Sequence, residues 1–294
     1  MKVLNFGSLN LDFVYQVDHM VSPGETLASL QMQTFCGGKG LNQSIALAKA
    51  GAEVYHAGCI GEDGRLLVEA LEKEGVRTDY VKTLEGKTGH AIIQVDRGGQ
   101  NCILLYGGAN RAQTEEYVDQ VLAGFDAGDM ILLQNEINLL GYIIDRAYDR
   151  GMTIVLNPSP FDENLAGCDL SKVSVFLINE VEGSQITGEK DPERILEKLA
   201  ETYPGTHVVL TLGSEGSVYQ ADGCRIRQNI YHVETVDTTA AGDTFTGYFV
   251  ASLLEGLDVA ECMDLAAKAS ALSVTRQGAS PSIPRRQEVL DWEA

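Results

Sequence analysis

The chain has 294 residues, 44% of them hydrophobic and 22% charged, which is enough for one large α/β domain of ordinary globular composition. Its 22 basic and 42 acidic residues give a formal charge of −20, so its surface repels nucleic acid and anionic membranes and we expect neither as a partner. Six cysteines without C-x-x-C pairing, and the lack of an apolar run of about 18 residues, indicate a reduced cytoplasmic protein without signal peptide or membrane span.

Two alternating patterns predict the main fold. Short, nearly continuous apolar runs are typical of strands buried on both faces, and they occupy residues 3–6, 130–133, 153–156, 175–178 and 208–212. Helical patterns lie between them or close to them, at residues 42–50, 65–74, 114–123, 139–149 and 192–202. This alternation predicts an α/β fold with a doubly wound, mostly parallel sheet flanked by helices.

A second class of strand alternates polar and apolar residues with a period of two, at residues 11–15, 29–33 and 90–95. We expect these runs to form a small β-sheet lid, inserted from about residues 11–35 and 88–106 into a single domain that spans residues 1–294. The alternative is an antiparallel edge of the main sheet.

The glycine-rich segment 37–43, Gly-Gly-Lys-Gly-Leu-Asn-Gln, precedes a predicted helix. It matches neither the G-x-x-x-x-G-K-[ST] phosphate loop nor the G-x-G-x-x-G dinucleotide fingerprint. Its glycines, Gly38 among them, allow the backbone to approach a ligand, and Lys39 and Asn42 can hydrogen-bond to hydroxyl groups. The alternative is a tight turn with a solvated lysine.

Asn10 and Asp12 share one face of a predicted strand, where an amide and a carboxylate can hold adjacent hydroxyls of a sugar. Two solvated residues on an edge strand are the competing interpretation. Glu136 also follows a buried strand, and the carboxyl ends of parallel strands are where ligands bind.

Two further polar segments follow buried strands. Asn179 and Glu182 lie three residues apart, so they share a helix face and can orient Mg²⁺-bound water, unless Asn179 only caps the helix. Residues 211–216, Thr-Leu-Gly-Ser-Glu-Gly, can wrap a nucleotide or form only a hairpin turn.

Residues 237–243, Asp-Thr-Thr-Ala-Ala-Gly-Asp, lead into an apolar helical run. A turn of small residues into a helix exposes backbone N–H groups at the positive end of the helix dipole, which makes an anion site. A carboxylate in such a site fits phosphoryl transfer, with the amides holding a phosphate and Asp243 accepting the proton of the attacking hydroxyl. The alternative is that Asp243 only stabilises the start of the helix.

Taken together, these motifs resemble the ribokinase-like (PfkB) carbohydrate kinases. Segments 37–43 and 237–243 look like the two signatures of that family, in the right order and with matching spacing. The similarity runs nearly end to end, through residues 7–12, 23–26, 108–110, 157–160, 179–182 and 274–282. Within the family, the G-G-K-G-x-N-Q form is most like the ribose kinases.

The resemblance implies a ribokinase-like fold and ATP-dependent phosphorylation of the primary hydroxyl of ribose, with Asp243 as the base. It implies an anion hole of Ala240, Ala241 and Gly242. It implies sugar contacts by Asn10, Asp12, Gly38, Lys39, Asn42 and Glu136. It implies Mg²⁺ and nucleotide contacts by Asn179, Glu182, Thr211, Gly213 and Gly216. The alternatives are a kinase for deoxyribose, fructose or adenosine and, further away, a sugar-binding regulator without catalysis.

The resemblance also implies activation by K⁺ or a similar monovalent cation, and a homodimer formed through the lid. Positions matching the cation loop are Asp237, Thr239, Ser273, Arg276, Gly278 and Ser282. The chain departs from the usual family pattern in having Ala240 in place of glycine, Thr246 in place of asparagine, and Ala267-Lys268 near the expected adenine, which leaves the nucleotide preference open.

Overall fold

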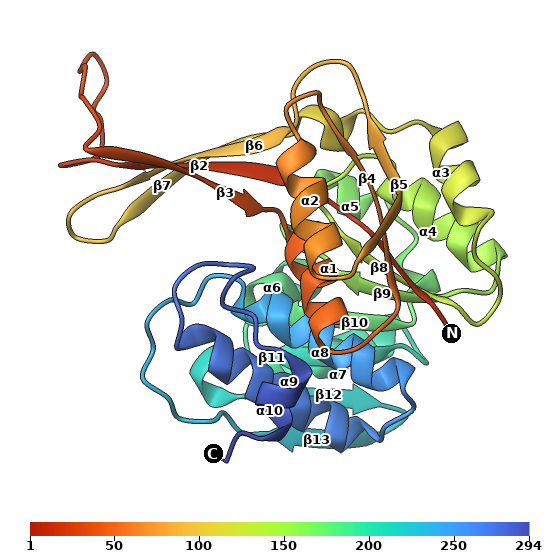
Figure 1. Cartoon of the computed structure of the whole chain (residues 1–294). Helices are drawn as coiled ribbons and strands as arrows, with labels where there is room; N and C mark the ends of the chain where they lie inside the picture. The colour runs from red at the N-terminus through yellow and green to blue at the C-terminus, as the bar shows by residue number, and fades with distance from the viewer. Residues whose placement is uncertain (294) are drawn as a thin grey trace.

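The computed structural model describes residues 1–293, and its largest element is a nine-stranded sheet of order β13-β12-β11-β10-β9-β8-β1-β4-β5 (Figure 1). Neighbouring strands from β11 to β5 are parallel, while β12 and β13 continue one edge antiparallel. The strands are β1 Val3–Phe6, β4 Val54–Ile60, β5 Arg77–Thr83, β8 Met130–Gln134, β9 Thr153–Asn157, β10 Val175–Asn179, β11 His207–Thr211, β12 Ser217–Ala221 and β13 Cys224–Gln228. The predicted doubly wound, mostly parallel sheet is confirmed.

Helices cover both faces of this sheet, and each face has its own apolar core. One core contains side chains of α1 Lys39–Lys49, α2 Arg65–Lys73, α8 Ala241–Leu254, α9 Val259–Val274 and α10 Arg286–Leu290. The other contains side chains of α3 Glu115–Leu122, α4 Leu140–Asp149, α5 Glu163–Ala166 and α7 Pro192–Thr202, with α6 Glu180–Thr187 packed against it.

Local sequence explains where these elements begin and which way they face. Val3 and Leu4 are both fully buried, and they enter opposite cores because successive strand side chains point to opposite faces. Helix α9 begins at a capping box of Asp258 and Glu261, whose side chains each accept the other's backbone N–H. No helix within residues 1–293 is long and apolar enough to cross a membrane.

A second sheet of four strands projects from the main body like an arm (Figure 1). Its order is β3-β2-β6-β7, with β2 Asn10–Gln16, β3 Gln31–Gly37, β6 Gly89–Val95 and β7 Asn101–Tyr106. β2 and β6 are parallel, and the outer pairs are antiparallel. The period-two runs therefore do not form an edge of the main sheet. Because β2 is an inner strand, the interpretation of Asn10 and Asp12 as solvated edge residues is wrong.

The topology also determines where loops gather. β1 lies between β8 on one side and β4 on the other, so the order of the chain along the sheet reverses at β1. Ligands of open α/β sheets bind at the carboxyl ends of the strands beside such a reversal. The segments that follow β1, β8, β9, β10 and β11 all leave from this edge of the sheet.

Candidate active site

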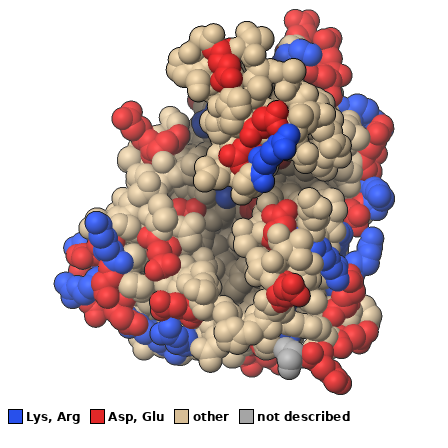
Figure 2. All heavy atoms as spheres, turned by 90° about the vertical axis from the view of Figure 1, so that its left-hand side faces the viewer, with Lys and Arg blue, Asp and Glu red and all other residues tan. Residues whose placement is uncertain are grey.

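A cavity lies at this edge of the sheet, on a face whose surface is hollowed at its centre (Figure 2). Its lining joins the N-terminus of α8 to the ends of β9, β10 and β11. The lining residues are Lys39, Asn157, Leu177, Ile178, Asn179, Glu182, Thr211, Thr238, Ala240, Ala241, Gly242, Asp243, Phe245 and Thr246. Eight residues singled out by the sequence are among them, namely Lys39, Asn179, Glu182, Thr211, Ala240, Ala241, Gly242 and Asp243.

The start of α8 forms one wall of the cavity. Ala240 is the N-cap residue, and its φ of 60° is in the left-handed region, which glycine adopts at less cost than alanine. No side chain caps this helix end. A Cβ on Gly242 would meet nothing within 4 Å, so space is open beside its backbone. An uncapped helix N-terminus with open space beside it suits an anion.

Asp243 lies in the first turn of α8, and only 7% of its surface is exposed. Its carboxylate does not cap the helix. Instead, Oδ2 accepts a hydrogen bond from Asn42 Nδ2 at 3.0 Å, and Oδ1 accepts one from Gln43 Nε2 at 2.9 Å. Both donors belong to α1, about 200 residues earlier in the chain. The two amides hold the carboxylate in one orientation beside the helix N-terminus.

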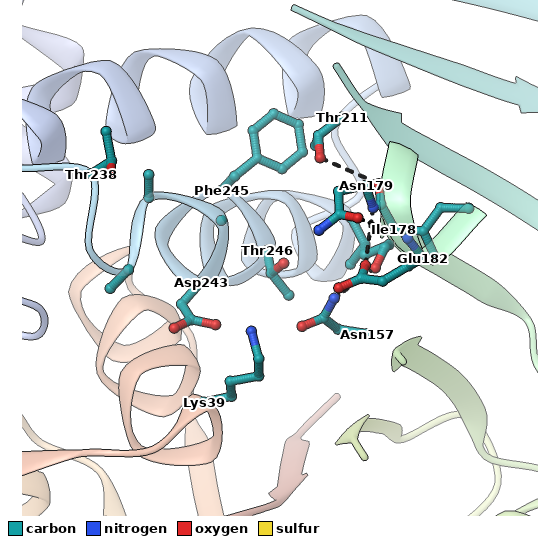
Figure 3. Close-up of a pocket in the computed structure, with 14 residues that line it drawn as sticks. Lys39, Asn157, Ile178, Asn179, Glu182, Thr211, Thr238, Asp243, Phe245 and Thr246 are labelled. Atoms are coloured by element: carbon teal, nitrogen blue, oxygen red, sulfur yellow. Dashed lines mark hydrogen bonds between the residues drawn. The ribbon is translucent and has the colours of Figure 1, made fainter. Parts of the chain in front are cut away.

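Lys39, the first residue of α1, points into the cavity beside Asp243 (Figure 3). Burial lowers the pKa of its ammonium group, but the carboxylates of Asp243, Glu136 and Glu182 outweigh burial and leave that pKa above its usual value. The side chain therefore stays charged at neutral pH. The alternative of a solvated lysine on a turn is wrong.

Three predicted sugar contacts meet around the end of β1. A carboxylate oxygen of Glu136 accepts hydrogen bonds from the Ser8 hydroxyl and, at 3.0 Å, from the backbone N–H of Lys39. Asn10 Oδ1 accepts a bond from Asn110 Nδ2 at 2.8 Å. A Cβ on Gly38 would lie 3.1 Å from the backbone nitrogen of Asn10, so this turn passes close to β2.

Asp12 extends from β2 toward the same region. Burial is the main cause that raises the pKa of this carboxyl to about 6, and the negative charge of Glu136 adds to the effect. A Cβ on Gly37 would lie 2.0 Å from Asp12 Oδ2, so the missing side chain of Gly37 provides the space for this carboxylate. Two half-buried acidic groups, Asp12 and Glu136, thus share this end of the site.

The ends of β10 and β11 form the opposite wall (Figure 3). Asn179 does cap α6, because its Oδ1 accepts the Glu182 N–H at 2.9 Å while Glu182 Oε2 accepts the Asn179 N–H at 3.0 Å. Both residues nevertheless line the cavity. Thr211 lines it too, whereas Gly213 and Gly216 lie beyond the lining, in the connection between the antiparallel strands β11 and β12.

The predicted cation loop joins two segments beside α8. Asp237 Oδ1 accepts bonds from the Thr239 N–H and hydroxyl, at 2.9 and 2.6 Å, and Oδ2 accepts the Gly278 N–H at 2.9 Å. Burial opposes but does not outweigh these bonds, which hold the pKa of Asp237 below its usual value. The Ser273 carbonyl accepts the Arg276 N–H, and the Ser282 hydroxyl donates to the Ala279 carbonyl.

Several residues of the site were not assigned a role from the sequence. Gln43 donates to Asp243 and also to Asn157, which lies behind it. Ser8 donates to Glu136, and Asn110 donates to Asn10. All four lie in segments that resemble the carbohydrate kinases, and this location was the signal by which the sequence could have marked them as candidate site residues. Their roles depend on contacts between distant segments, which the sequence pattern does not contain.

Comparisons with known proteins show the family of this chain. The family model described as pfkB family carbohydrate kinase matches residues 1–286. A ribokinase of Haemophilus influenzae is 38% identical over 97% of this chain and 96% of its own length. The crystal structure of ribokinase from Thermotoga maritima covers 99% of this chain and 98% of its own, with 34% identity and a TM-score of 0.87. The structure of Arabidopsis thaliana ribokinase complexed with ribose and ATP has 33% identity and a TM-score of 0.87, with 99% of both chains covered. The chain belongs to the pfkB family of carbohydrate kinases.

Proposed function

We propose that this protein transfers the γ-phosphoryl group of ATP to the primary hydroxyl of ribose and forms ribose 5-phosphate and ADP. The observation that carries the proposal is a buried carboxylate, Asp243, held by two amides beside an uncapped helix N-terminus. The relatives support the choice of substrates, since one of them was solved with ribose and ATP.

In this reaction, Asp243 accepts the proton of the attacking hydroxyl as its oxygen bonds to the γ-phosphorus. The bond from that phosphorus to the leaving ADP oxygen breaks at the same time. The N–H groups of Ala240, Ala241 and Gly242 stabilise charge on the transferring group, and the ammonium of Lys39 adds a positive charge to the same cavity.

The sugar would lie at the β1 end of the site. Asn10, Asp12, Glu136 and Asn42 supply acceptors there, Gly38 gives close approach of the backbone, and Lys39 supplies donors; all six were predicted as sugar contacts. The Oδ1 atom of Asn42 is buried and has no partner within residues 1–293, so a sugar hydroxyl directed at it would satisfy it.

ATP would occupy the β10 and β11 side, with Mg²⁺ on its phosphates. The capping bond uses Oε2 of Glu182 and leaves Oε1 for water on the metal, and Asn179 lines the same wall. Thr211, Gly213 and Gly216 would lie along the nucleotide. Mg²⁺ supplies charge neutralisation at the phosphates when bound.

A K⁺ ion, or a similar monovalent cation, fits the loop beside α8. The donor set consists of the Asp237 carboxylate, the carbonyls of Thr239, Ser273, Arg276 and Gly278, and the Ser282 hydroxyl, and Ser273 and Ser282 are buried. Because this loop leads into the anion hole, the cation would fix the hole's geometry. Replacing K⁺ by Na⁺ at constant ionic strength should lower kcat, and an unchanged kcat would count against this assignment.

The small four-stranded sheet is the predicted lid, and its exposed outer strand supports a homodimer formed through it. Every residue of β7 is exposed, and it carries Ile103, Leu104 and Leu105 with exposed fractions of 53%, 67% and 61%. Apolar side chains gathered on an exposed strand favour association. Sedimentation should give a dimer for the wild type and a monomer for Leu104→Glu.

The free cysteines are consistent with a cytoplasmic protein.

Initial rates with ribose, 2-deoxyribose, fructose and adenosine test the main proposal, with ATP, Mg²⁺ and K⁺ present. We expect the highest kcat/KM for ribose, because a site built to bond one hydroxyl discriminates strongly against a substrate that lacks it. A preference of about tenfold or more for another compound would overturn ribose as the substrate. Binding of ribose without any phosphoryl transfer would indicate a sugar-binding regulator instead.

A further inference from the structure

A buried network of side-chain amides lies directly behind Asp243. We call Asn5, Gln43, Gln134 and Asn157 the amide network. Asn5, Gln43 and Gln134 are fully buried, and Asn157 is partly buried. Within the network, Gln134 Nε2 donates to Gln43 Oε1 at 2.7 Å and to Asn5 Oδ1 at 2.9 Å, and Gln43 Nε2 donates to Asn157 Oδ1 at 3.0 Å.

One end of the amide network is anchored on the backbone of β10. Asn157 Nδ2 donates to the carbonyl of Leu177 at 2.8 Å. A carbonyl can only accept, so this bond turns the oxygen of Asn157 toward Gln43. Gln43 must therefore present its NH₂ group to Asn157.

The other end is anchored on the backbone of α1. Asn5 Nδ2 donates to the carbonyl of Gly40 at 2.8 Å and to the Ser44 hydroxyl at 2.8 Å, which turns the oxygen of Asn5 toward Gln134. Ser44 in turn contacts His56 Nδ1 at 2.8 Å. Burial lowers the pKa of His56 to about 3, against a smaller opposing effect of the Gly7 carbonyl, so His56 is neutral.

Both anchors impose the same polarity on Gln43. From the Leu177 side its NH₂ group must face Asn157, and from the Gly40 side its oxygen must face the NH₂ group of Gln134. The Gln43 NH₂ group has a second hydrogen, and this one is donated to Asp243 Oδ1 at 2.9 Å. If the amide of Gln43 were flipped, its oxygen would face the acceptors of Asn157 and Asp243, and its NH₂ group would face that of Gln134.

We propose that Gln43 is a positioning residue for Asp243, with a donor polarity set by the Leu177 and Gly40 carbonyls through the amide network. This inference rests on the proposed role of Asp243 as the base. The terminal torsion of an aspartate is intrinsically broad, and rotating it here breaks the bonds from both Gln43 and Asn42. Gln43 thus keeps a carboxylate oxygen directed at the substrate hydroxyl without touching the substrate.

Gln43→Leu tests this role, with Gln220→Leu as a matched control. Gln220 is also a buried glutamine, donating to the Leu196 carbonyl and accepting from Arg225, but it lies in β12 outside the cavity. For folded Gln43→Leu we expect kcat to fall about 10- to 100-fold, with KM for ribose and ATP within about threefold of wild type. Gln220→Leu should lower Tm and leave kcat within about twofold.

Gln43→Glu is a second, nearly isosteric variant. It keeps the volume of the side chain but replaces the donating NH₂ group with an oxygen, which repels Asp243. We expect its kcat to fall at least as far as that of Gln43→Leu, because the carboxylate removes both donated hydrogen bonds and adds a negative charge beside Asp243. Wild-type kcat in Gln43→Glu would overturn the proposal, including when Gln43→Leu does not fold.

A double-mutant cycle separates this proposal from the proposed function. If Gln43 acts through Asp243, adding Gln43→Leu to Asp243→Asn should lower kcat by no more than about threefold further. A full additional loss would show an independent effect and overturn the positioning role. Near-normal kcat in Asp243→Asn would instead overturn the base assignment, and a large loss there with normal kcat in Gln43→Leu would overturn only the present inference.

Discussion

The site contains two aspartate carboxylates that the fold treats differently, Asp243, which is buried, and Asp12, which is half-buried. Asp243, from the main body, accepts a side-chain amide on each oxygen, and the charged Lys39 lies in the same cavity. Asp12, from the small sheet, lies against the backbone of Gly37, and its pKa is raised to about 6, first by burial and then by Glu136.

This difference shows how one cleft can hold a base and a binding group made of the same functional group. Donors and a nearby cation hold the Asp243 carboxylate in orientation, which suits a group that must meet a hydroxyl in the transition state. Burial and, to a smaller extent, the neighbouring Glu136 carboxylate make the charge of Asp12 costly, so a ligand that donates hydrogen bonds to Asp12 relieves that cost.

The largest effect is expected for Asp243→Asn. The amide cannot take up the proton of the attacking hydroxyl, so kcat should fall by about 10² or more, while affinity for ribose stays within a few-fold of wild type. Steady-state kinetics and calorimetric titration with ribose measure the two quantities. Near-normal turnover would mean that another group is the base and that the two carboxylates do not differ in the way described.

Asp12 should make ribose binding depend on pH. Above about pH 6 the carboxyl is ionised and accepts sugar hydroxyls, and below that value it is protonated, so KM for ribose should rise as pH falls from about 7.5 to 5. Loss of a charged hydrogen bond is worth about tenfold or more, so Asp12→Asn should show a raised KM that no longer varies over this range. A flat profile in the wild type would contradict this role.

Gly37→Ala tests whether the space for Asp12 matters. The new Cβ would lie 2.0 Å from Asp12 Oδ2, so the carboxylate must move. We expect KM for ribose to rise several-fold with a smaller change in kcat. Gly167→Ala is the control, because its Cβ would lie at an ordinary 3.5 Å from the Asn164 carbonyl. Equal KM values for the two variants would show that the position of Asp12 is unimportant.

The smallest effect is expected for Glu136→Gln on the pH profile. Removing the negative charge lowers the pKa of Asp12, so the midpoint of the KM profile should move to lower pH. Because burial is the larger cause, we expect a shift of less than about one pH unit. A midpoint that stays in place, measured against the wild type in the same buffers, would show that Glu136 does not influence Asp12.

The sequence predicted elements whose signal is local. The run at residues 3–6 is β1 with the same bounds, and the pattern at residues 192–202 is α7. Helix α1 begins three residues earlier than the pattern at 42–50 predicts. Glycine weakens a helix prediction, yet a Cβ on Gly40 would lie 2.4 Å from the Ser8 nitrogen, so packing against residues 7 and 8, which follow β1, requires glycine in the first turn.

Strands β4, β5, β12 and β13 were not predicted. β4 contains Ala57 and Gly58 between apolar residues, and the buried His56 breaks its apolar pattern. β5 and β13 carry charged residues because they are the outer strands of the main sheet, where one side is free of a neighbouring strand. Their pairing is a property of the whole sheet, which no short window of sequence expresses.

By itself, the sequence determined the alternation of buried strands and helices, the glycine-rich approach to α1 and the small-residue turn that presents Asp243, because these depend on propensity and spacing over a few residues. Only the tertiary structure decided which donors Asp243 receives and how acidic Asp12 is. Gln43 meets Asp243 across 200 positions of the chain, and Glu136 acts on Asp12 from the end of a different sheet. Hydrogen-bond polarity and pKa depend on what surrounds a group in space, and folding alone brings those surroundings together.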